Sequence, residues 1–148
     1  MKISRKTDYA LKTVIDLALH DRQVVPGAHI ARRQDIPIKF LEQILLILKG
    51  AGVVSSRRGK NGGYSLAQRP SNITLASVVR LSEGSVSLTP NPRQSVGQAP
   101  SDEVESSLQK VWADINDYIA GRLEEVTLQD MCDRVAELSR EQQTQYVI

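Results

Sequence analysis

The amino-acid sequence predicts a mainly α-helical fold with a small β-hairpin, arranged as a winged helix-turn-helix followed by one long helix. Three observations predict it. Residues 53–67 contain two short β-prone runs around a basic, glycine-rich turn. Two helical segments separated by a proline come directly before that hairpin. An apolar stripe at helical spacing runs through residues 104–126.

The length and composition place the chain among single-domain proteins. Its 148 residues are enough for one domain with appendages. No apolar run reaches the roughly 18 residues of a membrane span, and Met1 leads into a helical pattern without the apolar region of a signal peptide. We therefore expect a cytoplasmic protein. Cys132 is the one cysteine, which excludes an intramolecular disulfide and a metal site built from several cysteines.

Charge is distributed unevenly along the chain. Residues 1–70 contain six lysines and seven arginines against five acidic residues, a net charge of +8. Residues 71–148 contain six cations against twelve acids, a net charge of −6. A basic first half is typical of a protein that binds a polyanion, and the acidic second half is then expected to face away from it. Solvated surface charge of random sign is the alternative.

The first predicted helix begins after Ser4, a favourable N-cap residue, and ends near His20. We expect it in the core, because its apolar residues recur at the i, i+3, i+4 spacing: Ala10, Leu11, Val14, Ile15, Ala18 and Leu19. A short helix over residues 28–34 follows. It ends at Ile36-Pro37, because a residue before proline is disfavoured in the α conformation.

The third predicted helix runs from Ile38 to Lys49 and is followed by glycines. We expect its strongly apolar C-terminal half only to pack, which leaves the exposed N-terminal half as the part that would enter a major groove if the partner is DNA. Gln43 can pair with adenine, Glu42 can accept a hydrogen bond from cytosine, and Lys39 can reach guanine or a phosphate. Taken alone, this helix is also compatible with an ordinary solvated face.

The turn of the hairpin carries three cations and three glycines: Arg57, Arg58, Lys60, Gly59, Gly62 and Gly63. Glycines let the backbone approach a phosphate closely, and the cations supply charge. A hairpin of this kind directly after the third helix indicates double-stranded DNA as the partner. A winged helix that serves protein or RNA contacts is the competing function. An enzyme is not expected, because no nucleophile, base and orienting acid cluster near a glycine turn.

Four segments, MKISRKTDYAL, IPIKFLEQILLILKGAGVV, SSRRGKNGGYSLA and ITLASVVRLSEG, resemble the Rrf-type family of bacterial winged-helix transcriptional regulators. The resemblance covers nearly the whole chain. It implies a homodimeric DNA-binding regulator. We expect a repressor, and an activator is the alternative. Members of the family include an iron-sulfur cluster regulator, a nitric-oxide-sensing repressor and a repressor of cysteine metabolism.

The resemblance also implies which residues contact DNA. They lie in the first helix, the third helix and the hairpin: Lys6, Tyr9, Ile38, Lys39, Phe40, Gln43, Ser56, Arg58 and Gly59. In the family the hairpin arginine enters the minor groove, so Arg58 is expected there, whereas Arg57 and Lys60 are expected at phosphates. Lys39 and Phe40 replace the polar or tyrosine residues of relatives, which leaves the base preference open.

A long helix is predicted from Ser101 onward, with acidic residues in its first turn. One apolar stripe follows its length: Val104, Leu108, Val111, Trp112, Ile115, Ile119, Leu123 and Val126. About 24 residues span roughly 35 Å, more apolar face than the body needs, so we expect a homodimer through this helix, as the resemblance also implies. Such a dimer matches a palindromic operator. Closure of the monomer core by Trp112 is the alternative. A last helix is predicted over residues 127–138, before an apolar tail over residues 146–148.

Residues 85–100 are rich in Ser, Pro and Gly, and we expect a flexible effector loop between a DNA-binding domain (1–84) and the dimerisation and C-terminal helices (101–148). Cluster-binding relatives hold three cysteines in this region and this chain holds none, so no cofactor is expected. An atypical cluster that uses Asp8 with Cys132, His20 or His29 is the alternative. The cysteine-free region is closer to the cysteine-metabolism repressor, which implies a regulatory protein or a small-molecule effector.

Overall fold

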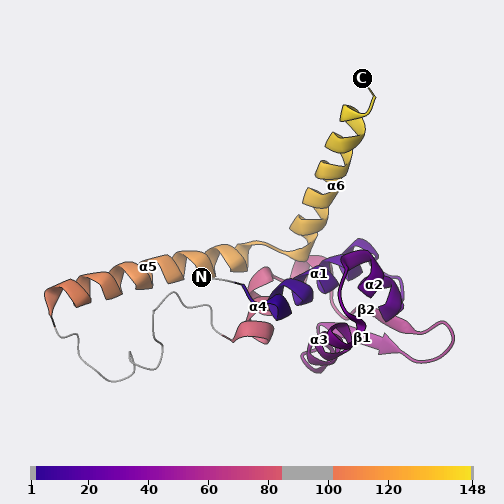
Figure 1. Cartoon of the computed structure of the whole chain (residues 1–148), viewed down its shortest axis with the longest axis horizontal. Helices are drawn as coiled ribbons and strands as arrows, with labels where there is room; N and C mark the ends of the chain where they lie inside the picture. The colour runs from indigo at the N-terminus through magenta and orange to yellow at the C-terminus, as the bar shows by residue number, and fades with distance from the viewer. Residues whose placement is uncertain (1–2, 85–101, 148) are drawn as a thin grey trace.

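The computed structural model describes residues 3–84 and 102–147. The elements follow in the order α1 (Arg5–Leu19), α2 (Gly27–Gln34), α3 (Ile38–Gly50), β1 (Val54–Arg57), β2 (Gly63–Leu66), the short 3-10 helix η1 (Pro70–Asn72), α4 (Leu75–Glu83), α5 (Glu103–Glu125) and α6 (Leu128–Gln145). This order confirms the predicted mainly α-helical fold with a small hairpin. In Figure 1, α1 to α4 and the hairpin form the body, and α5 and α6 extend from it in different directions.

Helices α1 and α6 begin with side-chain caps at the residues that the sequence predicts. The Ser4 hydroxyl accepts a hydrogen bond from the Thr7 amide at 3.2 Å at the start of α1. At the start of α6, Thr127 and Asp130 form a reciprocal capping box. The predicted end of α6 was wrong: the helix continues past Leu138 to Gln145, because residues 139–145 contain neither glycine nor proline to stop it.

The core lies where α1, α2 and α3 meet α4 and the base of the hairpin. Its most completely buried large side chains include Leu17, Ile30, Leu41, Leu45 and Val78. The prediction for the end of α1 was partly wrong, since Leu19 is 44% exposed and Leu17 is buried. A periodicity count near a helix end does not fix which residue of the last turn faces inward.

The hairpin is attached to the body at its base. β1 and β2 pair antiparallel with Val54 opposite Leu66 and Arg57 opposite Gly63. The backbones of Val25 and Tyr64 exchange two hydrogen bonds of 2.8 Å, so a single β-bridge joins the segment before α2 to the two-stranded hairpin. Gly63 is needed there, because a Cβ at this position would lie 2.4 Å from the Val25 carbonyl oxygen.

Hydrogen bonds join the N-terminal end of α1 to the C-terminal end of α4. The Thr7 hydroxyl donates to the Glu83 carboxylate at 2.7 Å, and the Ser4 amide donates to the same carboxylate oxygen at 2.8 Å. These hydrogen bonds from Ser4 and Thr7 hold the pKa of Glu83 below its usual value. The start of α1 is therefore fixed relative to the body.

The corner between α5 and α6 is also attached to the body. The Leu75 amide donates to the Val126 carbonyl at 2.8 Å, and the Leu128 amide donates to the Ile73 carbonyl at 2.9 Å. Arg80 on α4 forms an ion pair with Glu124 near the end of α5. The two long helices thus share one anchored corner and leave it in different directions (Figure 1).

Two further expectations concern other parts of the chain. The predicted effector loop at residues 85–100 lies outside the described residues. Among the helices of residues 3–84 and 102–147, none is long and apolar enough to cross a membrane.

Candidate nucleic-acid interface

The first half of α3 presents the face that the sequence predicts. Leu41, Ile44 and Leu45 are buried against the core. The candidate base-reading residues lie on the other side and are exposed: Ile38, Lys39, Phe40, Glu42 and Gln43. Ile38 and Phe40 are 45% and 56% exposed, which is high for apolar side chains. The helix therefore offers both polar and apolar groups to a partner.

The second half of α3 departs from the expectation that it only packs. Leu46 is 73% exposed, the highest value on this helix for a large apolar side chain among the described residues. It lies three residues after Gln43 and seven after Lys39, so it shares their outward face. Residues 44–48 are all apolar, so the sequence alone does not show that Leu46 is the one that faces outward.

Tyr9 and Phe40 connect α1 to α3. Their rings meet edge to face with centroids 6.3 Å apart and planes inclined by 63°. Tyr9 is half-buried and packs on the core, so its ring supports that of Phe40. The contact brings the predicted α1 residues next to those of α3.

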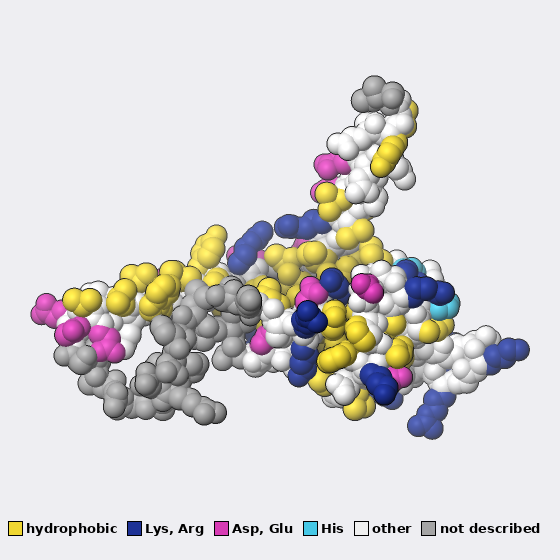
Figure 2. Space-filling view, in the orientation of Figure 1, with side chains coloured by type: hydrophobic (Ala, Val, Ile, Leu, Met, Phe, Trp, Pro, Cys, Tyr) yellow, Lys and Arg dark blue, Asp and Glu magenta, His cyan; other side chains and the backbone are white. Residues whose placement is uncertain are grey.

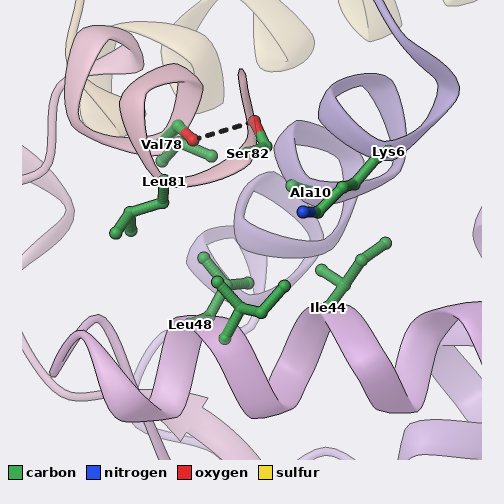
Figure 3. Close-up of a pocket in the computed structure, with 8 residues that line it drawn as sticks. Lys6, Ala10, Ile44, Leu48, Val78, Leu81 and Ser82 are labelled. Atoms are coloured by element: carbon green, nitrogen blue, oxygen red, sulfur yellow. Dashed lines mark hydrogen bonds between the residues drawn. The ribbon is translucent and has the colours of Figure 1, made fainter. Parts of the chain in front are cut away.

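Lys6 lies one turn before Ala10 on the same helix, at a small gap between α1, α3 and α4 (Figure 3). The gap is lined mainly by apolar side chains, including Ile44 and Val78, and its volume is about 10 Å³. That is room for about one water molecule and not for an organic effector.

The tip of the hairpin exposes its cations. Ser56, Arg57, Arg58, Gly59 and Lys60 are all exposed. The turn closes with a 3.0 Å hydrogen bond from the Gly62 amide to the Gly59 carbonyl. A Cβ on Gly62 would lie 2.4 Å from the Arg57 carbonyl oxygen, so only glycine fits this turn. Figure 2 shows the Lys and Arg side chains projecting from the hairpin into solvent.

The electrostatics of this surface favour an anionic partner. Within residues 3–84 and 102–147, Lys39, Arg57, Arg58 and Lys60 take part in no ion pair, so their charges are available to phosphates. The acid nearest the start of α1 is neutralised instead, since Asp8 forms an ion pair with Lys12 at 2.8 Å. α3 leads directly into β1 and packs beside it (Figure 1), which makes one cationic surface of the two elements.

α5 carries an apolar stripe that the described residues cover only in part. None of its 23 residues is buried. Val104, Leu108 and Val111 are at least 51% exposed, and Ile115 is 37% exposed. Trp112, Ile119 and Leu123 are half-buried. Hydrophobic side chains follow one edge of this helix in Figure 2.

The candidate ligands of an atypical cluster are not gathered in one place. Among the described residues, no group of three or more His, Cys, Asp or Glu side chains is arranged to hold a metal ion. Asp8 is paired with Lys12, and the His20 ring is hydrogen-bonded to the Asp16 carbonyl at 2.8 Å. Burial raises the pKa of the Cys132 thiol, and Asp133 and Asp21 raise it further. With one such thiol, the donor set does not fit an iron-sulfur cluster.

Comparison with known proteins gives consistent matches over most of the chain. The model of the Rrf2 family, described as "Iron-dependent Transcriptional regulator", matches residues 3–134. An rrf2-like HTH-type transcriptional regulator of Rhodobacter capsulatus is 37% identical over 136 residues, which cover 87% of this chain and 91% of the relative. The HTH-type transcriptional regulator IscR of Vibrio atlanticus is 33% identical over 145 residues, covering 96% of this chain and 82% of the relative.

Solved structures show the same fold. CymR, the global cysteine regulator of B. subtilis, superposes with a TM-score of 0.77 at 30% identity, covering 90% of this chain and 98% of CymR. IscR of T. potens superposes with a TM-score of 0.75 at 31% identity, covering 93% of this chain and 90% of IscR.

Proposed function

The chain belongs to the Rrf2 family of DNA-binding transcriptional regulators, and from this premise we propose that it represses transcription as a homodimer on a palindromic operator. The observation that carries the proposal is the shared surface of α3 and the hairpin, where exposed base-reading side chains lie beside cations without ion pairs among the described residues. The proposed place of action is the cytoplasm.

In this proposal α3 enters the major groove and the hairpin contacts the flanking backbone. Gln43, Glu42 and Lys39 contact base edges, because their side chains are exposed on the outward side of α3. Arg58 enters the minor groove, where a narrow A·T-rich segment concentrates negative potential. The remaining contacts position the protein on sugar and phosphate: Lys6, Tyr9, Ser56, Arg57, Gly59 and Lys60.

The homodimer is proposed through α5. Seven apolar residues of this helix form the proposed interface, and each is exposed or half-buried in a single chain: Val104, Leu108, Val111, Trp112, Ile115, Ile119 and Leu123. A two-fold axis across this helix would present two copies of α3 to two half-sites of a palindrome, about one helical turn apart. The acidic residues of α5 and α6 would then lie away from the operator.

Selection from random duplexes tests the proposal. The full-length protein is used to enrich bound sequences, and light scattering gives the mass of the complex. We expect a palindromic consensus and two chains for each duplex. Enrichment of a single asymmetric site bound by one chain would contradict the proposed dimer, and absence of any enriched sequence would contradict sequence-specific binding.

The family is described as iron-dependent, whereas the sequence contains one cysteine and no group of side chains in residues 3–84 and 102–147 is arranged to hold a metal ion. We propose regulation by a small molecule or a protein partner. Anaerobic purification followed by iron analysis and an absorption spectrum tests this. A protein without stoichiometric iron that binds its operator supports the proposal, whereas a cluster chromophore whose loss changes operator affinity contradicts it.

A further inference from the structure

Three exposed side chains follow one another along the outward face of α3. Phe40, Gln43 and Leu46 are spaced by three residues, so they are neighbours along one ridge of the helix. Phe40 is 56% exposed and Leu46 is 73% exposed. The ridge therefore alternates an apolar, an amide and an apolar group.

The two apolar side chains cannot read hydrogen-bonding groups of a base. In the major groove, the apolar feature that distinguishes one base from another is the C5 methyl group of thymine. The amide of Gln43 can bind adenine in bidentate fashion, and adenine is always paired with thymine. A ridge of this composition is therefore complementary to a short A·T-containing segment.

The surroundings of the ridge favour DNA over a protein as its occupant. Lys39 lies on the same face of α3, and the cations Arg57, Arg58 and Lys60 lie on the adjoining hairpin without ion pairs among the described residues. Phe40 is also held in place, since its ring meets that of Tyr9 edge to face. A supported ring loses little conformational freedom when it contacts a base.

We propose that Phe40 and Leu46 read thymine methyl groups on either side of the base pair that Gln43 contacts. The inference rests on the proposed function, because it requires α3 to lie in the major groove. It adds Leu46 to the base-reading residues and assigns to Phe40 the recognition of thymine through its methyl group.

The test replaces single thymines of the selected operator with deoxyuridine, which removes only the methyl group. Burial of one methyl group is worth about a fourfold change in affinity. We expect the affinity of the wild-type protein to fall about fourfold at two thymine positions, one contacted by Phe40 and one by Leu46. Phe40→Ala should abolish the loss at one position and Leu46→Ala at the other, while Gln43→Ala should retain both losses.

The outcomes separate this inference from the proposed function. If the operator is bound specifically but every deoxyuridine substitution leaves affinity unchanged, the methyl readout is wrong and the proposed function stands. Losses that persist in both alanine variants also overturn the assignment. If selection enriches no sequence, the proposed function fails first. Because the substitutions are made in the DNA, the wild-type result does not depend on whether a variant folds.

Discussion

Arg33 on α2 donates two hydrogen bonds to the buried carboxylate of Asp16 on α1, from Nε to Oδ2 at 3.0 Å and from Nη2 to Oδ1 at 2.7 Å. The Gln34 amide donates a third to Oδ2 at 2.8 Å. Asp16 is 1% exposed. This cluster fixes α2 against α1, and α2 is followed after a three-residue turn by α3, so the orientation of the base-reading helix depends on it.

Replacing Arg33 with alanine should destabilise the fold. The variant leaves the Asp16 carboxylate buried without its bidentate partner. Removing one partner of a fully buried pair costs roughly 3–5 kcal/mol, and we expect about 2 kcal/mol here because the Arg33 side chain is partly exposed. Urea unfolding measures the change. Arg32→Ala, at an exposed position of the same helix, is the control and should change the free energy of unfolding by less than about 0.5 kcal/mol.

The same carboxylate predicts an acid-sensitive contribution to stability. Burial raises the pKa of Asp16, but hydrogen bonds from Arg33 and Gln34 outweigh this and hold the pKa below its usual value. Its stabilising contribution is therefore present above the ordinary pKa of about 4 and is lost as the pH falls through the lower pKa of the folded state. Between pH 5 and about pH 2, the free energy of unfolding of wild type should fall more steeply than that of Asp16→Asn. Parallel curves would show that Asp16 is not the titrating group.

Arg58→Ala should weaken operator binding by about 1–3 kcal/mol. If Arg58 enters the minor groove, the loss should be largest on operators with A·T-rich flanks, where the groove is narrow. Fluorescence anisotropy with matched A·T-rich and G·C-rich flanks measures both effects. Arg140→Ala on α6 removes an exposed cation far along the chain from the hairpin and should leave affinity unchanged. An equal loss on all flanks would assign Arg58 to phosphate contact instead.

Trp112→Asp should dissociate the proposed dimer, because it places a charge in the apolar stripe of α5. The DNA-binding body should stay folded, since α5 contributes no buried residue to it. Light scattering and circular dichroism measure the two properties. Ala113→Asp adds the same charge to the next, exposed residue, outside the stripe, and should leave the dimer intact. A dimeric Trp112→Asp protein would place the interface elsewhere.

Much of the fold is readable from local sequence. Ser4 and Thr127 mark helix starts because their side chains accept from nearby amides, and proline and glycine mark the turns around α2 and α3. The end of α6 was not readable, because residues 139–145 contain no helix breaker and nothing local defines an end. The burial of Asp16 was also missed, since its partners Arg33 and Gln34 lie on another helix and only the tertiary fold brings them to it.

The candidate site was readable where residue type and spacing act together. The cations and glycines of residues 57–63 are close in sequence, so their common turn could be predicted. Leu46 was missed, because its exposure depends on which side of α3 meets the core, and every residue from 44 to 48 is apolar. The Tyr9 and Phe40 contact depends on the packing of two helices and had no local signal.

The central claim is that α3 and the hairpin bind one duplex together, and the salt dependence of operator affinity tests it most directly. Wild-type affinity should fall steeply with salt, and Arg57→Ala/Lys60→Ala should reduce the slope of log K against log salt by about 0.9 for each lost phosphate contact, or roughly 3.6 for a dimer. Gln43→Ala should weaken binding with the slope unchanged. The claim would be contradicted if the Arg57→Ala/Lys60→Ala variant kept the salt slope of the wild-type protein. It would also be contradicted if Gln43→Ala bound the operator with the affinity of the wild-type protein.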